Sequence, residues 1–331
     1  MFGTRGKLPR VPNLSGHAMA APNQVNNANQ EVFSNAQYHR RIVRKRQITF
    51  LLLASPALFW FLAFMLWPLL NMFYISTMRW DGLALPQKFI FLDNFIRIIK
   101  DPNIAVALRN TGIHLLVGIP GVVLPAFMFG YFMSLRKPGF KIIRTIFFLP
   151  AMISVAAMAM IFLGLYRPDG MLNTLLTNVG LSSLTRVWLM NRSTSLGSLI
   201  AIDIWSGIGF YSVLFFAALS SISQELYEAA RLDGAGYWDI MWKIAFPLML
   251  DFFAVIVILQ FLYILSGAAQ NVILLTGGGP GTATLTLGFY LYNQAFLTQR
   301  LGYSQAIAVF LFFVGIAVIL LIRRISSRLS Y

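Results

Sequence analysis

Residues 228–247 read EAARLDGAGYWDIMWKIAFP and lie between two long apolar stretches. The segment carries three acids and two bases, and Glu225 adds a further acid just before it. Asp233-Gly234 is a turn signal, and the residues on either side have the periodicity of short amphipathic helices. We therefore expect a helix, a glycine hinge and a second helix, held at both ends by membrane spans and shaped to fit a groove of a partner protein.

Local signals refine this expectation. Ser221 and Gln224 have the spacing of a capping box, which predicts the start of the first helix. Pro247 follows the second helix and opens the next span at a position where its missing N–H costs nothing. Apolar residues recur at helical spacing on each helix, namely Leu226, Ala229 and Ala230 on the first and Trp238, Met241, Trp242 and Ala245 on the second.

The composition indicates an integral membrane protein. Of the 331 residues, 58% are hydrophobic and only 11% are charged, whereas a soluble domain carries about 25% charged residues. The excess forms uncharged runs long enough to cross a bilayer as helix. The net charge of +15 comes from bases that mostly flank these runs, so it indicates membrane orientation rather than nucleic-acid binding. The chain has no cysteine, which excludes disulfides and thiol catalysis.

The fold class that we expect is an all-α integral membrane protein with six transmembrane helices. Residues 276–300 contain a glycine-rich run and a short, moderately apolar segment, which we interpret as an extracytoplasmic loop with a short interfacial helix. With both termini in the cytoplasm, 17 of the 26 bases lie inside, as the positive-inside rule requires. The expected spans are residues 48–76, 111–135, 145–166, 196–220, 248–275 and 301–322.

Two regions follow from this count. Residues 1–46 are polar and end in a basic cluster, and we interpret them as a disordered cytoplasmic tail whose cluster anchors the topology. Residues 47–331 form the six-span domain, with the charged cytoplasmic loop at 221–247.

Polar residues inside spans are candidates for the substrate pathway, because an ionised side chain at the bilayer centre costs at least about 2.5 kcal/mol. One face of the fourth span and one face of the fifth each present such a set. A carboxylate, a hydroxyl, a gap and an aromatic ring make a plausible sugar surface. The two sets are Asp203, Ser206, Gly207 and Phe210 on the fourth span, and Gln260, Ile264, Gly267 and Asn271 on the fifth.

These residues could have structural roles instead of lining a substrate pathway. Asp203 could pair with a base of another subunit, and the Gly and Ser residues could serve close helix packing. Asp251 lies near a helix N-terminus, where a structural role is expected. His114 lies near the end of its span, which favours a satisfied interfacial residue over a ligand.

At residues 228–247 the chain resembles the permease subunits of ATP-binding-cassette importers. Their signature is Glu-Ala-Ala, three residues, Gly, nine residues, Ile, one residue, Leu, Pro, and here Phe246 replaces the Leu. A second block, LTGGGPG at 275–281, is similar to carbohydrate importers of the maltose type. The resemblance covers about residues 45–325 and implies the type I importer permease fold. It also implies that Glu228, Ala229, Ala230, Asp233 and Gly234 dock to a separate ATPase.

The resemblance further implies the partners and the location. These are a second permease, two ATPase subunits that bind ATP and Mg, an extracytoplasmic sugar-binding protein, and the lipid of a bacterial or archaeal inner membrane. The chain itself would be no enzyme and hold no cofactor, and its glycine-rich run lacks the GK[ST] ending of a phosphate loop. In this family the substrate pathway is similarly lined by the spans before and after the charged loop, which matches Asp203, Ser206, Gly207, Phe210, Gln260, Ile264 and Gly267.

Three alternatives remain open from the sequence. The cargo could be another polar solute, such as glycerol phosphate or a polyamine, although the spans contain no convergent bases for a phosphate. A proton-coupled secondary transporter that uses Asp203 and Asp251 would leave the charged loop unexplained. A membrane enzyme would need paired acids, a metal cluster or a nucleophile with its base, and the sequence places no such set at one membrane face.

Overall fold

The computed structural model describes residues 46, 49–82, 88–135 and 138–329, and the chain divides into two units, residues 1–69 and 70–331. In the first unit an apolar helix begins at Thr49 and passes through the π-helical turn η1 (Leu62–Leu66). The rings of Trp60 and Phe64 stack on it with centroids 4.8 Å apart. The predicted tail, residues 1–46, lies outside the described residues except for residue 46.

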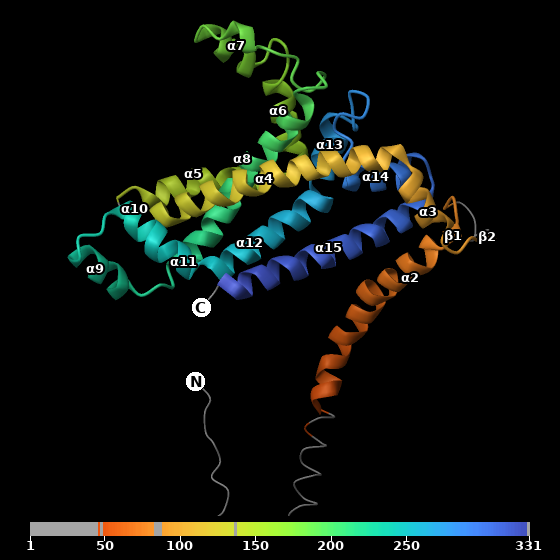
Figure 1. Ribbon diagram of the computed structural model, residues 1–331, viewed down its shortest axis with the longest axis horizontal. Helices are drawn as coiled ribbons and strands as arrows, with labels where there is room; N and C mark the ends of the chain where they lie inside the picture. The colour runs from red at the N-terminus through yellow and green to blue at the C-terminus, as the bar shows by residue number, and fades with distance from the viewer. Residues whose placement is uncertain (1–45, 47–48, 83–87, 136–137, 330–331) are drawn as a thin grey trace, which may run out of the picture. The chain divides into compact units, whose positions relative to one another are not determined.

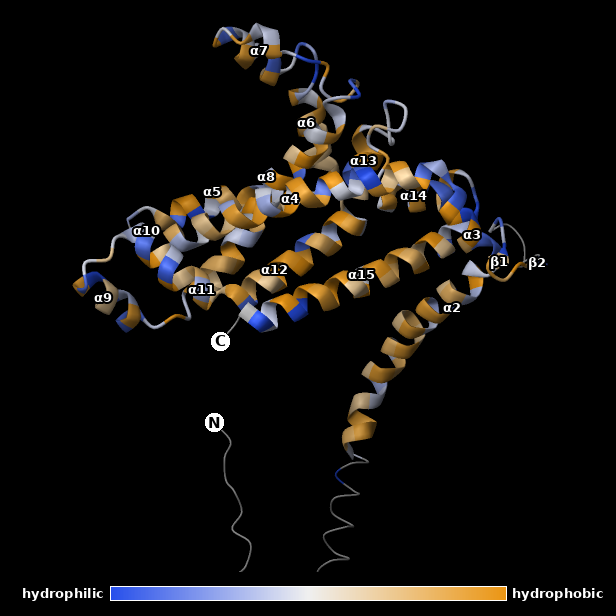
Figure 2. Ribbon diagram, viewed as in Figure 1, coloured by the Kyte–Doolittle hydropathy of each residue, from blue (hydrophilic) through white to orange (hydrophobic). Residues whose placement is uncertain are grey.

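The described residues contain five helices long and apolar enough to cross a membrane, or six if one bent pair counts as a single span. The five candidate spans are Thr49–Ser76, Pro102–Ser134, Ser195–Leu219, Leu250–Leu275 and Leu301–Arg328. Figure 2 shows that hydrophobic residues predominate along α2 (Trp67–Ser76), α12 (Leu250–Leu262) and α15 (Leu301–Leu329).

The predicted third span, residues 145–166, is not a straight helix. It is divided between α5 (Phe140–Met152) and α6 (Val155–Leu165), which are bent by 98° relative to each other. Pro150 lies in the last turn of α5, Ile153 is extended, and the side chain of Ser154 caps α6. An uncharged run shows only that a segment is apolar, so its hydropathy could not reveal this break.

The remaining elements follow the chain in the order shown in Figure 1. Two short strands pair antiparallel, with Met78 opposite Phe89. The bounds are β1 (Met78–Arg79), β2 (Lys88–Phe89), α3 (Asp93–Lys100), α4 (Pro102–Ser134), α7 (Met171–Asn178), η2 (Ser182–Leu184), α8 (Ser195–Leu219), α9 (Gln224–Leu232), α10 (Tyr237–Ile240), η3 (Met241–Ala245), α11 (Phe246–Leu248), η4 (Tyr263–Gly267), α13 (Ala269–Leu275), α14 (Leu287–Tyr292) and η5 (Asn293–Leu297).

Close backbone approaches fix the central helices α4, α5 and α8. A Cβ on Gly209 of α8 would lie only 1.9 Å from the carbonyl oxygen of Phe147 in α5. A Cβ on Gly130 of α4 would lie 2.9 Å from the carbonyl oxygen of Ser212 in α8. Small residues permit this spacing between membrane helices, so these two glycines have a packing role.

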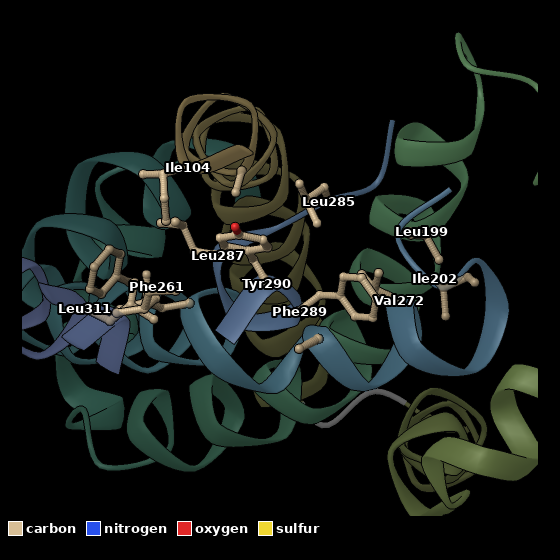
Figure 3. Packing of buried hydrophobic residues seen from close by; sticks show 14 of the residues in the cluster. Ile104, Leu199, Ile202, Phe261, Val272, Leu285, Leu287, Phe289, Tyr290 and Leu311 are labelled. Atoms are coloured by element: carbon tan, nitrogen blue, oxygen red, sulfur yellow. The ribbon is translucent and has the colours of Figure 1, made fainter. Parts of the chain in front are cut away.

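The buried apolar residues of the second unit form two clusters. One joins the first part of α8 to α13, α14 and α15, and Figure 3 shows part of it around Leu287, Phe289 and Tyr290. The other joins the later parts of α4 and α8 to the segment from α9 to α12, around Phe127, Phe215 and Met241. The candidates of the fourth span and Gln260 of the fifth lie in sequence between the parts that supply these clusters.

The segment 276–300 packs more deeply into the protein than we expected of a loop. Its short helix, α14, is not a candidate span, as predicted. However, Leu287, Phe289 and Tyr290 are buried in the first cluster. The amide of Asn110 in α4 also donates to the carbonyl oxygens of Thr282 and Leu285, at 3.0 Å each. The helix is therefore part of the core, which a moderately apolar sequence did not indicate.

Candidate functional site

A cavity of about 260 Å³ lies beside the middle of α8. The break between α5 and α6 supplies one wall, so the bend that interrupts the third span also shapes this space. The cavity is lined by Pro150, Ala151, Ile153, Val155, Met158, Asp203, Ser206, Gly207, Phe210, Tyr211, Gln260, Tyr263 and Asn271.

Asp203 is the centre of a buried polar cluster on the wall of this cavity. Its side chain is 1% exposed. Oδ1 accepts hydrogen bonds from the hydroxyl of Tyr263 at 2.7 Å and from the amide of Asn271 at 2.6 Å. Nε2 of His114 in α4 lies 3.2 Å from Oδ2 but is not aligned for a hydrogen bond. One carboxylate thus connects α4, α8 and both halves of the fifth span.

The predicted pathway residues separate into two groups. Five of them line the cavity: Asp203, Ser206, Gly207 and Phe210 of α8, and Gln260 of α12. Ile264 and Gly267 do not line it. Ile264 is 2% exposed and turns toward Gly118 in α4.

The reason for this separation is the π-helical turn η4, which interrupts the fifth span at Tyr263–Gly267. A π-helical turn shifts the faces of a helix, so residues counted at regular α-helical spacing no longer share one side. Gly267 has a packing role instead, because a Cβ there would lie 2.8 Å from the ring of Tyr263. Tyr263 was not predicted as a pathway residue, because its only signal in the sequence was a hydroxyl within an apolar span.

The structure also tests the predictions for His114 and Asp251. His114 does not lie near the end of its helix, because α4 extends from Pro102 to Ser134, and it is 2% exposed and faces Asp203. The expected span began too late along the chain, since α4 begins at Pro102. Asp251 lies in the first turn of α12, and its carboxylate accepts a hydrogen bond of 3.0 Å from the hydroxyl of Ser326 in α15. That contact agrees with a structural role.

The charged loop has the helix, glycine and helix arrangement that the sequence predicts. The helix α9 ends in a Schellman motif, in which the N–H of Gly234 donates to the carbonyl of Arg231 and the N–H of Ala235 donates to that of Ala230. Gly234 adopts φ +83°, the left-handed region that this motif requires. No atom lies within 4 Å of the position of a Cβ on Gly234.

The start of α9 differs from the predicted capping box. Ser223 is the N-cap and accepts a hydrogen bond of 3.3 Å from the N–H of Glu225. The hydroxyl of Ser221 instead donates to the carbonyl of Ala218 at the end of α8. Three serines and a glutamine lie within residues 220–224 and offered several caps, and spacing alone selected the wrong one.

The loop buries one side and exposes the other. Ala230, Ile240, Met241 and Ala245 are buried in the second apolar cluster, and the hydroxyl of Tyr131 in α4 donates to the carbonyl of Tyr237 at 3.0 Å. The exposed side carries most of the predicted docking residues, together with apolar side chains of the two helices. These are Leu226, Glu228, Ala229, Leu232, Asp233, Gly234, Trp238 and Trp242.

Two charged side chains on this exposed side form an ion pair. Nζ of Lys243 lies 2.6 Å from Oδ1 of Asp239, one helical turn away. The hydrogen bond and charge of Lys243 hold the pKa of Asp239 below its ordinary value. Both groups are well exposed, so the pair contributes little to stability and leaves a charged surface.

Comparison with known proteins identifies the family. Residues 121–331 match the family described as "Binding-protein-dependent transport system inner membrane component". The chain is 34% identical over 289 residues to the probable ABC transporter permease YurN of Bacillus subtilis, covering 85% of this chain and 96% of that protein. It is 30% identical to the diacetylchitobiose uptake permease NgcF of Streptomyces coelicolor, covering 87% and 86% of the two chains.

A solved structure supports the same assignment. The chain superposes on a bacterial ABC transporter involved in the import of the acidic polysaccharide alginate with a TM-score of 0.73 and 26% identity, over 88% of this chain and 100% of that one. The apolar helices and the helix–glycine–helix loop support the same family as these similarities do. The chain belongs to the family of inner membrane components of binding-protein-dependent transport systems, the permeases of ABC importers.

Proposed function

We propose that this permease imports a neutral sugar and that the Asp203 cavity forms its part of the pathway. The observation that carries the choice of cargo is the chemistry of the cavity wall. Among the described residues that line it, the polar groups are hydroxyls, amides and one carboxylate, and no lysine or arginine is present. An anionic solute would need opposing cations, whereas sugar hydroxyls pair with hydroxyl and amide groups.

The single carboxylate of the wall is already engaged within the chain. Oδ1 of Asp203 accepts hydrogen bonds from Tyr263 and Asn271, and Oδ2 is buried 3.2 Å from Nε2 of His114. A cationic cargo such as a polyamine would need an acid whose oxygens are open to the cavity, which favours a neutral solute. The amide nitrogen of Gln260 is buried without a hydrogen-bond partner in the described structure and is available to a sugar hydroxyl.

A second permease would complete the site. The cavity volume of about 260 Å³ is just below that of typical small-molecule sites, which is roughly 300–1,000 Å³. NgcF, the diacetylchitobiose permease, and the alginate transporter are each named for a saccharide cargo. These names support a saccharide, and the cavity wall favours a neutral one over an acidic one.

The loop from Ser221 to Pro247 would couple transport to a separate ATPase. Its buried side is fixed to α4 and α8, while Glu228, Asp233 and Gly234 are exposed. The exposed apolar side chains around them form a patch of the kind that a partner protein binds. In this arrangement ATP and Mg are bound by the ATPase, both termini lie in the cytoplasm, and an extracytoplasmic binding protein delivers the sugar.

Uptake into right-side-out membrane vesicles tests the proposal. We expect accumulation of a radiolabelled neutral disaccharide that depends on internal ATP, persists with a protonophore when ATP is supplied, and is not competed by glycerol 3-phosphate, spermidine or an alginate oligosaccharide. Uptake that collapses with the protonophore despite ATP would identify a proton-coupled transporter. Preferred uptake of a charged comparator would contradict the neutral cargo.

A further inference from the structure

A second pocket, of about 450 Å³, lies where α2 ends and α15 begins, and it shares no lining residue with the Asp203 cavity. Figure 1 shows β1, β2 and α3 gathered near the start of α15. We call this the arginine pocket. It is lined by Met78, Arg79, Trp80, Asp81, Ile90, Asp93, Asn94, Arg97, Gln299, Arg300 and Tyr303.

The walls of the arginine pocket are held rigidly. The amide of Asn94, which is 5% exposed, donates to the carbonyls of Ser76 and Met78 at 2.8 and 2.9 Å. The N–H of Gly302 donates to the carbonyl of Trp80 at 3.1 Å. A Cβ on Gly302 would lie 2.0 Å from the carbonyl oxygen of Met78, so α15 approaches β1 as closely as a backbone can.

Three arginines from separate segments of the chain line this pocket. Arg79 belongs to β1, Arg97 to α3, and Arg300 directly precedes α15, and all three are exposed. Cζ of Arg97 lies 4.8 Å from the ring centroid of Tyr303, a cation–π contact that fixes the guanidinium plane. Guanidinium groups offer forked N–H donors that match the oxygens of a phosphate.

The charge balance of the pocket favours a single negative charge. Two carboxylates, Asp81 and Asp93, share the wall with the three arginines. The five charged side chains therefore carry a net charge of one positive unit. A phosphodiester without an amine would neutralise this net charge, whereas a zwitterionic headgroup has no net charge and would leave it uncompensated.

Exposed aromatic and apolar side chains lie close in sequence to the residues of the pocket. Tyr74 lies in the last turn of the first span and is 55% exposed. Trp and Tyr gather at the headgroup level of a bilayer. Next to the pocket, Phe89, Phe91, Ile96 and Ile99 expose between 48% and 86% of their surface. Exposure of these apolar side chains to water is unfavourable, whereas they can pack against acyl chains.

We propose that the arginine pocket binds the phosphate of an anionic phospholipid headgroup, while the exposed apolar side chains beside it contact the lipid tails. The lipid would hold β1 and α3 against the start of α15. This role goes beyond the transport of a sugar, and it requires neither the second permease nor the ATPase.

Native mass spectrometry of the purified full chain tests this assignment. The protein is prepared in detergent with an equimolar mixture of phosphatidylglycerol and phosphatidylethanolamine, and the retained lipids are identified. We expect the wild type to retain phosphatidylglycerol preferentially. The Arg97→Gln/Arg300→Gln variant should bind it more weakly by a factor on the order of 25, because each arginine near a lipid surface contributes about fivefold.

A matched control removes two charges elsewhere. Arg167→Gln/Arg186→Gln changes two exposed arginines of the segment around α7, and it should retain phosphatidylglycerol as the wild type does. If the double variant of the pocket fails to fold, Arg300→Gln alone, which removes no ring contact with Tyr303, should still lower retention about fivefold.

Three outcomes would overturn the proposal. Equal retention by the wild type and the pocket variant would show that the arginines do not select the lipid. Displacement of the lipid by millimolar inorganic phosphate would identify a site for the free anion. Unchanged lipid retention together with weakened binding of the extracytoplasmic binding protein would identify a docking surface for an acidic protein.

Discussion

The hydroxyl of Tyr263 donates a 2.7 Å hydrogen bond to Oδ1 of Asp203, and it does so from a π-helical turn in the middle of the fifth span. With Asn271 bound to the same oxygen, this relationship ties the fifth span to α8 at the wall of the cavity. Asp203 therefore has a positioning role that a sugar-binding interpretation of the sequence did not include. It would shape the pathway by holding Tyr263 and Asn271 in place.

Truncating Asp203 should mainly destabilise the protein. In Asp203→Ala the donors of Tyr263 and Asn271 lose their acceptor, and each buried donor left unsatisfied costs about 1–3 kcal/mol. Tyr263→Phe removes one hydrogen bond to a charged group and should cost about 1–3 kcal/mol. The free energy of unfolding, measured by denaturant titration of the full chain in detergent, checks both values.

Ser206→Ala is the matched control on the same wall. Its hydroxyl donates to the carbonyl of Ile202 in its own helix, so its loss should change stability by no more than about 0.5 kcal/mol. If Asp203→Ala keeps full stability and loses only the stimulation of ATP hydrolysis by sugar, Asp203 is a direct ligand and its positioning role is wrong.

Close packing of α5 against α8 should depend on Gly209. A Cβ at this position would lie 1.9 Å from the backbone oxygen of Phe147, which cannot move without shifting α5. We expect Gly209→Ala to lower the free energy of unfolding by about 1–3 kcal/mol, as overpacking does, and to reduce uptake because the break after α5 lines the cavity. Gly197→Ala on the same helix meets open space and should be neutral or slightly stabilising. Equal behaviour of the two variants would refute this role.

Gly234 should be required for docking more than for folding. Its φ of +83° makes any side chain unfavourable, by about 1 kcal/mol for alanine. Because nothing lies within 4 Å of a Cβ at this position and the residue is exposed, a tryptophan side chain should extend into solvent. We expect Gly234→Ala and Gly234→Trp to have similar stability, whereas Gly234→Trp alone fails to bind the ATPase in a pull-down with membranes.

Gly180 provides the control for backbone strain. It has a similar φ of +80° and also faces open space, but it follows α7 and lies outside the proposed docking loop. Gly180→Trp should leave ATPase binding unchanged. Binding lost equally in both tryptophan variants would attribute the effect to strain and not to docking.

Sequence patterns predicted the fold where they reported hydrophobicity and turn chemistry. Uncharged runs located the apolar helices, and Asp233-Gly234 correctly placed the hinge of the charged loop. They failed where backbone geometry departs from the regular helix. The break at Ile153 divided the third span, and the π-helical turn at Tyr263–Gly267 moved Ile264 and Gly267 away from the cavity. Neither departure changes hydropathy, so no count of apolar residues could detect it.

For a related reason, only part of the polar cluster around Asp203 could be predicted from the sequence. Asp203 stood out because a carboxylate within a span is costly. Its partners His114 and Tyr263 come from other spans, and helix pairing is not encoded in the spacing along one helix. Contacts within one element can be predicted from periodicity, whereas contacts between α4, α8 and the fifth span needed the structure.

Asp101 should make stability depend on pH at the start of α4. Burial raises the pKa of this carboxyl group, but hydrogen bonds from Tyr290, Tyr303 and the N–H of Asn103 outweigh burial and hold it below its ordinary value of 3.8. The charged form is thus favoured in the folded state. Its contribution to stability is complete above pH 3.8 and is lost as the pH falls through the lowered pKa. Asp101→Asn keeps a capping side chain but loses the charge-assisted hydrogen bonds.

Thermal unfolding of the full chain in detergent between pH 7 and pH 3 measures this dependence. At pH 7 we expect Asp101→Asn to be less stable than the wild type by about 1–2 kcal/mol, the difference between charged and neutral acceptors. The gap should begin to narrow below about pH 4, as the carboxyl group of the unfolded chain protonates, and should narrow further as the pH approaches the lowered pKa of the folded state. Asp169→Asn is the control, because its pKa is also lowered, by the hydrogen bond from Arg167, but the pair is exposed and should contribute no measurable stability. A gap that stays constant from pH 7 to pH 3 would show that Asp101 acts only as a helix cap and that its charge is not used.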